Sequence, residues 1–213
     1  MRNLVSSSLL ICLLLLASCA PGITKGFRKA TSMHVQKEAF YPFFPAADSV
    51  LLFNMQIDFG KNHFSGILLV KSTGKDRYRT VFTSHFGMSV FDFEVDSDSF
   101  RVNYCLEALH KKRFLQILEA DFSALLFLNP ETDGSLSDIY VNDAASGLEV
   151  IKAGKYYYLK NKVSETLIAI EAPQPVNARR YRFSDYKDKF PALIQIQHSH
   201  IGLKMQLERI NRE

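Results

Sequence analysis

Apolar and polar residues alternate along much of the chain, which is the pattern of half-buried β-strands. Over residues 51–59 every odd position carries a large apolar side chain, so one face of this strand is apolar along roughly 30 Å. Short turns connect it to a second strand at 63–71, a hairpin at 73–95 and a fifth strand at 100–104. Consecutive strands joined by such turns predict an antiparallel meander.

The apolar spacing changes after Leu106 to steps of three and four residues, which indicates an amphipathic helix. The helical stripe consists of Phe114, Ile117, Leu118, Phe122, Leu125 and Leu126. Asn129 and Pro130 are expected to end the helix, and the polar residues 131–147 are expected to form a long loop. Six further short strands are predicted at 148–152, 155–160, 163–171, 177–184, 193–199 and 201–210.

These elements predict a mainly β protein with a helical lid (α+β). We expect an open, strongly curved antiparallel half-barrel of about 11 strands, with one or more helices on its concave face. Such a half-barrel would leave an apolar trough for acyl chains, because each buried methylene contributes about 0.8 kcal/mol. Eight residues are expected to line it: Phe53, Met55, Ile57, Phe82, Phe91, Phe93, Phe114 and Leu118. The same periodicity also fits a sheet and a helix that simply pack into a core.

The first residues have the features of a bacterial export signal. Arg2 precedes an apolar run at 9–16 that is too short to cross the roughly 30 Å of a bilayer core comfortably. The sequence Leu16-Ala17-Ser18-Cys19 resembles the lipobox of bacterial lipoproteins, in which the cysteine becomes the N-terminus and carries acyl chains such as palmitate. An ordinary secretory signal is the alternative. We expect a signal peptide at 1–18, a lipidated N-terminus and tether at 19–47, and a half-barrel domain at 48–213.

Composition and charge narrow the function classes. The chain is 47% hydrophobic and 23% charged, which suits a substantial core, and its net charge of +4 does not indicate a nucleic-acid-binding surface. With Cys12 in the signal and Cys19 acylated, Cys105 stands alone and no intramolecular disulfide is expected. Cys105 is interpreted as a buried apolar residue, and a nucleophile acting with His110 is the alternative.

The sequence lacks common catalytic and cofactor motifs. It contains no Gly-x-Ser-x-Gly, no His-Glu-x-x-His, no phosphate loop and no pair of Cys-x-x-Cys sites. His198 and His200 lie two residues apart, so a metal site is one interpretation and exposed strand-end histidines are the other. We therefore expect a protein that is not an enzyme, with no metal and no cofactor other than the covalent acyl chains on Cys19.

Two groups of basic residues have alternative interpretations. The basic residues of the predicted tether either contact lipid head groups or belong to a soluble spacer. Those of a predicted strand either bind lipid phosphate or an acidic carrier, or form a solvated strand edge. The groups are Lys25, Arg28 and Lys29 in the tether, and Arg179, Arg180 and Arg182 in a predicted strand.

The hairpin at 73–95 has an unusual tip. Its sequence is His85-Phe86-Gly87-Met88, whereas hairpin tips usually carry Asn, Asp, Gly or Ser. A large apolar residue at this position either folds back onto the protein or enters another apolar phase.

The hairpin resembles the corresponding strand–loop–strand segment of the LolB family, and the lipobox and the final Gly202-Leu203-Lys204-Met205 fit the same family. The resemblance rests on two runs, Thr73-Gly74-Lys75-Asp76-Arg77-Tyr78-Arg79 and Thr83-Ser84-His85-Phe86-Gly87. Phe86 corresponds to the exposed leucine of the family tip, His85 replaces the family's proline, and Met88 adds a second apolar side chain. The family's tryptophans are absent from this chain.

The resemblance implies an outer-membrane lipoprotein that accepts lipoproteins from a LolA-like periplasmic carrier and inserts them into the membrane. It implies the open barrel and helical lid of the LolA/LolB fold, and a membrane-insertion tip formed by Phe86, Gly87 and Met88. Ala20 after the cysteine is compatible with outer-membrane sorting, so we expect a lipid-anchored monomer that faces the periplasm. The alternative is an envelope lipoprotein of the same fold that binds another apolar ligand or acts in assembly.

Overall fold

The computed structural model describes residues 22–40, 49–129, 133–142, 147–173, 178–187 and 190–210. The predicted signal peptide 1–18 and the acylation site Cys19 lie outside these residues, as do residues 41–48 of the expected tether and domain start. Within the described ranges, no helix has the length and apolar character that a membrane span requires.

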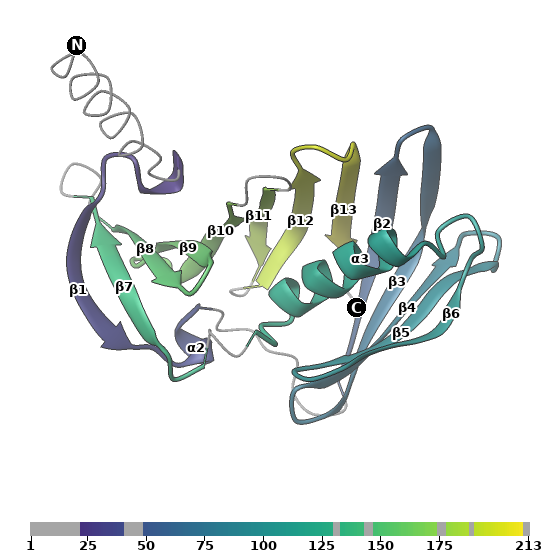
Figure 1. Cartoon of the computed structure of the whole chain (residues 1–213), viewed down its shortest axis with the longest axis horizontal. Coiled ribbons are helices and arrows are strands. Elements are labelled where there is room, and N and C mark those ends of the chain that lie inside the picture. The colour runs from purple at the N-terminus through teal and green to yellow at the C-terminus, as the bar shows by residue number, and fades with distance from the viewer. Residues whose placement is uncertain are drawn as a thin grey trace, which may run out of the picture.

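The dominant element is a single antiparallel sheet (Figure 1). Its strands are Arg28–His34 (β1), Val50–Phe59 (β2), Asn62–Gly74 (β3), Arg77–Ser84 (β4), Ser89–Asp96 (β5), Phe100–Cys105 (β6), Leu136–Val141 (β7), Leu148–Ala153 (β8), Tyr156–Asn161 (β9), Thr166–Ala172 (β10), Arg179–Lys187 (β11), Phe190–His198 (β12) and Leu203–Arg209 (β13). Their order across the sheet is β1-β7-β8-β9-β10-β11-β12-β13-β2-β3-β4-β5-β6. The C-terminal strand β13 therefore joins the meander β2–β6 to the strands from the second half of the chain.

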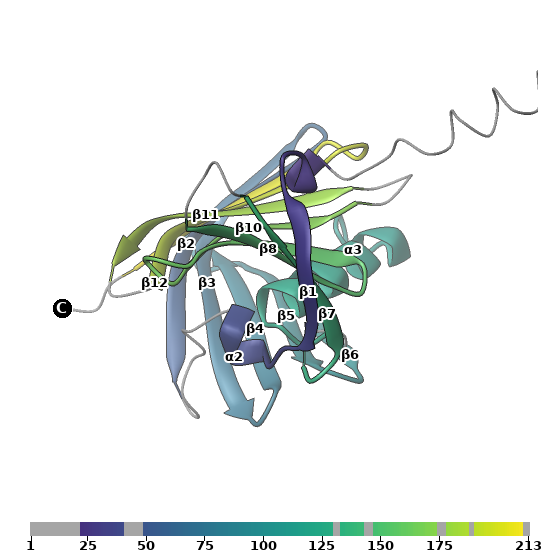
Figure 2. The ribbon, with the colours of Figure 1, turned by 90° about the vertical axis from the view of Figure 1, so that its left-hand side faces the viewer.

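The helices are Gly22–Thr24 (η1, a 3-10 turn), Lys37–Phe40 (α2) and Lys112–Leu125 (α3). The amphipathic helix predicted from the sequence is confirmed as α3, which lies across one face of the sheet (Figures 1 and 2). The ring of Phe114 lies 4.9 Å from that of Phe59 on β2, and the ring of Phe122 lies 5.9 Å from that of Phe91 on β5. The helix thus packs its apolar side onto widely separated strands.

Strand alternation positions the core as the sequence predicts. On β2, Phe53, Met55 and Ile57 are buried in the core, whereas Asn54 and Gln56 between them face solvent. Burying a large apolar side chain contributes about 1.5–3 kcal/mol, so the repeated alternation fixes which face of each strand turns inward.

The mainly β architecture is confirmed, with two corrections. First, the sheet has thirteen strands, because β1 and β7 form in segments expected to be tether and loop, and they pair with each other. Every residue of β1 is exposed, so its sequence carries no alternation that would reveal a strand. Second, the sheet is open and not strongly curved, with β1 and β6 at its two edges. Alternation determines the buried face of a strand, whereas curvature depends on twist and bulges summed over many strand pairs.

Candidate functional site

The β4–β5 hairpin tip presents its apolar residue to solvent. Phe86 is 99% exposed and Met88 is 53% exposed, so the tip does not fold back onto the protein. Backbone hydrogen bonds fix the turn: the Ser84 N–H donates to the Met88 carbonyl (2.8 Å) and the Gly87 N–H donates to the Ser84 carbonyl (2.9 Å). Gly87 has a φ of +79°, a conformation that favours glycine. The exposed Phe86 is therefore carried by a well-defined turn.

The base of this tip depends on a close approach between two backbones. Gly66 on β3 pairs with Ser84, and a Cβ at Gly66 would lie 1.9 Å from the carbonyl oxygen of Thr83. No side chain fits at that distance, so glycine is required for β3 to support the end of β4. A register shift between Phe82 and Thr83 gives β5 an extra residue at the same place, which bends the hairpin locally.

The residues expected to line an acyl trough are buried in the core. All eight of them are at most 3% exposed. Phe91 stacks on Phe93 with ring centroids 4.5 Å apart, and both rings lie edge-on to Phe122 of α3. The structure thus brings the predicted residues together, but α3 and the neighbouring side chains occupy the space that a trough would need.

An open groove lies where β1, β7, β8 and β9 are neighbours, on the face of the sheet that α3 covers elsewhere. Figure 1 shows these strands to one side of α3. The volume of the groove is about 410 Å³, which is in the range of ligand pockets. Ile139 pairs with Ile151, and Ile151 pairs with Tyr158 of the core, so these side chains share the face that α3 covers elsewhere. The lining is mainly apolar with a charged edge: Ala30, Thr31, Met33, Val35, Ala39, Ile139, Val141, Ile151, Glu149, Lys160 and Lys162. We call this the β1–β9 groove.

Lys160 gives the β1–β9 groove a partly desolvated cation. Its ammonium donates a hydrogen bond to the Ala39 carbonyl, and burial lowers the pKa of this ammonium below its usual value. Lys162 lies 3.6 Å from the Glu149 carboxylate. A cation beside an apolar lining favours a ligand that combines an apolar chain with an anionic end.

A buried polar cluster holds α3 against β11 and β12. The Tyr181 phenol donates a hydrogen bond to Asp121 on α3 (2.8 Å), and His198 Nε2 lies 3.1 Å from the other carboxylate oxygen. The Arg179 guanidinium lies 3.9 Å from the same aspartate. Burial and the Asp121 charge raise the pKa of Tyr181 well above its usual value, so the phenol stays a donor. The pair Asp121–His198 is fully enclosed, so a substrate has no access to it for acid–base chemistry.

The remaining candidates separate in the structure. His198 is buried whereas His200 is exposed in the turn after β12, so the two histidines do not face the same space. Nowhere in the described ranges do three or more His, Cys, Asp or Glu side chains gather at metal-binding distances. Burial raises the pKa of the Cys105 thiol, which lowers its thiolate fraction and argues against a nucleophile.

Sequence reasoning did not identify Asp121 or the β1–β9 groove. One signal was present for Asp121, because a single acidic residue stands inside the apolar stripe of α3. The groove had none, since its edge comes from the strands β1 and β7 that have no recognisable alternation.

Comparison with known proteins adds no assignment: no family model matches this chain, and no curated protein matches it either. The resemblance to the LolB family therefore stays a prediction from the residues of the hairpin, the lipobox and the C-terminal run.

Proposed function

We propose that this chain is a LolB-like lipoprotein that accepts lipoproteins from a LolA-like carrier and inserts them into the outer membrane. The observation that carries the proposal is Phe86, almost fully exposed at the end of a hydrogen-bonded hairpin. Transferring a phenylalanine side chain from water into an apolar phase gains about 1.5–3 kcal/mol, so the tip is suited to enter a bilayer. Met88 adds apolar surface next to it.

The β1–β9 groove supports the acyl-binding part of this proposal. Each methylene of an acyl chain that its apolar lining covers makes binding more favourable. Lys160 at the edge of the groove can pair with an anionic group at the end of the ligand. In this scheme α3 is the lid of the sheet. The acyl chains then lie beside α3 and not in the space beneath it.

Transfer needs no covalent chemistry in this scheme. Cargo moves from carrier to groove to bilayer because its acyl chains are buried more favourably at each stage, and the Phe86 tip holds the protein at the bilayer surface. The chain would be acylated at Cys19, anchored in the outer membrane, and face the periplasm as a monomer. Its partners would be the carrier, the cargo lipoprotein and outer-membrane lipid.

Replacing the tip residue tests the proposal. Phe86→Glu should leave folding and acyl binding intact, because this side chain has almost no contacts, and should cause a reporter lipoprotein to accumulate in the periplasm. The matched control is Val163→Glu, which places the same charge on another exposed apolar side chain (83% exposed) in the β9–β10 turn. Normal delivery in cells that carry only the Phe86→Glu protein would disprove a role for the tip.

A second candidate function is storage or transport of a free lipid in the β1–β9 groove, favoured by the groove's apolar lining and cationic edge. Lipids extracted from the purified protein separate the two candidates by mass spectrometry. An acylated protein other than this chain in the extract supports lipoprotein transfer, and free fatty acid or phospholipid alone supports the second candidate.

A further inference from the structure

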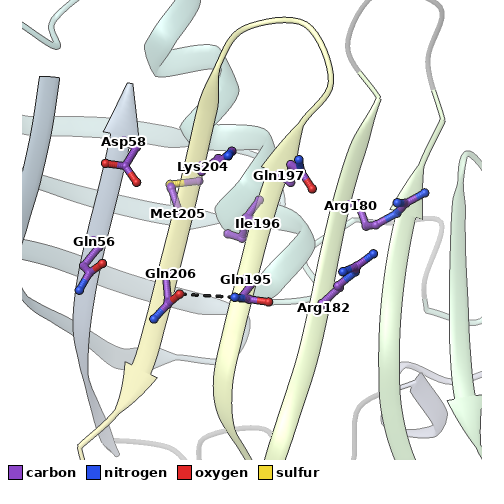
Figure 3. A pocket seen from close by; sticks show the side chains of 10 residues that line it. All are labelled: Gln56, Asp58, Arg180, Arg182, Gln195, Ile196, Gln197, Lys204, Met205 and Gln206. Carbon is purple, nitrogen blue, oxygen red and sulfur yellow. Dashed lines mark hydrogen bonds between the residues drawn. The ribbon is translucent and has the colours of Figure 1, made fainter. Parts of the chain in front are cut away.

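The face of the sheet opposite α3 carries a polar groove of about 220 Å³ across β2, β13, β12 and β11 (Figure 3). Strand register aligns Gln56, Gln206, Gln195 and Arg182 in one row, and the Gln195 amide donates to Gln206 (3.4 Å). Next to this row lie Asp58, Lys204, Gln197 and Arg180. Amide and guanidinium groups on four adjacent strands thus form one hydrogen-bonding surface.

A larger pocket of about 610 Å³ continues this groove towards β9 and β10. The two share Arg180, Arg182 and Gln195. The larger pocket adds apolar side chains from both the N-terminal segment and the sheet: Ile23, Phe27, Leu159 and Ile168. Because Tyr181 and Phe183 alternate with the two arginines and point to the core, this combined site lies on the opposite face from the β1–β9 groove.

The combined site has an excess of positive charge. Arg180 pairs with Glu171 (2.7 Å), whereas Arg182 and Lys204 form no ion pair with any residue in the described part of the chain. Lys25 from the N-terminal segment also lines the larger pocket. A guanidinium matches the geometry of phosphate oxygens, and the glutamine amides supply further donors. Positively charged and apolar side chains therefore lie next to each other in the combined site, as the binding of an anionic amphiphile requires.

We propose that this outer-face site binds an anionic glycerophospholipid. The phosphate lies against Arg180 and Arg182 with Gln195 beside it, and the upper part of an acyl chain lies against Ile23 and Phe27. The N-terminal wall of the pocket begins three residues after Cys19, so bilayer lipid is within reach when that residue is acylated. This supply of lipid rests on the proposed membrane attachment, whereas the binding itself does not.

Native mass spectrometry of the full-length protein released from detergent micelles tests the site. Phosphatidylglycerol, phosphatidylcholine and inorganic phosphate are added separately, and retained adducts are counted. We expect a phosphatidylglycerol adduct that Arg180→Gln/Arg182→Gln reduces by about tenfold, as the loss of charge-assisted phosphate contacts predicts. The matched control is Arg79→Gln/Arg101→Gln, which removes the same charge from exposed positions on β4 and β6.

Three results would overturn the proposal. If phosphatidylcholine is retained as well as phosphatidylglycerol, the site does not select for anionic lipid. If the phosphatidylglycerol adduct is unchanged in the double variant, the lipid binds elsewhere, for example in the β1–β9 groove. Inorganic phosphate that binds as strongly as the lipid would reduce the site to a simple anion site. Phe86→Glu should keep the adduct, so failure of this proposal and failure of the transfer function are distinguishable.

Discussion

The phenol of Tyr181 donates a 2.8 Å hydrogen bond to the carboxylate of Asp121, which joins β11 to α3 across the core. Both residues are buried, so the bond is formed without competition from water. Removing one partner of such a pair leaves the other desolvated and poorly compensated.

Tyr181→Phe should therefore lower the free energy of unfolding by about 1–3 kcal/mol, because the buried Asp121 carboxylate loses its hydrogen-bond donor. Urea unfolding followed by circular dichroism measures the change. Tyr104→Phe removes a hydroxyl from an exposed tyrosine on β6 and should have almost no effect. Equal stability of the Tyr181 variant and the wild type would mean that the bond does not stabilise the attachment of α3.

Gly66→Ala should destabilise the hairpin that carries Phe86. The new Cβ would lie 1.9 Å from the Thr83 carbonyl oxygen, so β3 and β4 must separate there, at a cost of about 1–3 kcal/mol. Gly74→Ala on the same strand is the control, because nothing lies within 4 Å of its Cβ position. Thermal unfolding should separate the two variants, and hydrogen exchange should show faster exchange at the tip only in Gly66→Ala.

Met33→Asp should weaken binding of an acyl probe to the β1–β9 groove. The side chain lines the groove and is half exposed, so a charge there raises the cost of covering it with methylenes without disturbing the core. A fluorescent fatty acid should lose about tenfold in affinity, since 1.4 kcal/mol corresponds to a factor of ten. Leu136→Asp, on the neighbouring strand β7 but outside the lining, should bind normally. Equal affinities for both variants would exclude this groove as the acyl site.

The protein should lose stability in acid through Asp92. The Arg79 guanidinium donates two hydrogen bonds to Asp92 (3.0 and 2.6 Å) and holds the pKa of this carboxyl below its usual value. Its folded pKa is depressed, so the stabilisation is complete above the unfolded value of about 3.9 and is lost as the pH falls through the folded value.

Urea unfolding between neutral pH and about pH 3 should thus show a decline in the free energy of unfolding that is smaller in Asp92→Asn. Asp98→Asn is the control, since the side chain of this acid is exposed and, among the described residues, only its backbone N–H donates a hydrogen bond, to Asp96. A decline of the same size in Asp92→Asn and the wild type would assign the acid sensitivity to other carboxyl groups.

Local patterns predicted those parts of the fold that bury one face of a strand or helix. Phe53, Met55 and Ile57 reveal β2 by their spacing alone, and Phe114, Leu118 and Phe122 reveal α3 in the same way. β1 escaped prediction because none of its side chains is buried, and its hydrogen bonds to β7 leave no trace in residue type.

The sequence predicted the candidate site only where the residues concerned are close together in the chain. The composition of the tip identified Phe86 as unusual, although only the structure decides that the side chain points to solvent. Arg179 could not be distinguished from Arg180 as a buried residue, because its contact with Asp121 joins positions far apart in the sequence. The position of an open groove likewise depends on where α3 lies on the sheet.

Pairing of β1 with β7 would limit how far the sheet can move from an acyl anchor at Cys19. A flexible tether over 19–47 would let the folded body range widely, but η1 and Phe27 already line a pocket on the sheet and β1 is hydrogen-bonded into it. For a chain acylated at Cys19, as proposed, the segment that connects the acyl chains to the sheet runs only from Cys19 to Gly22. An extended chain of this length spans about 10 Å. Under the proposed function, a protein held this close to its acyl chains would act only on the leaflet that contains them, so a carrier would have to bring the cargo to it.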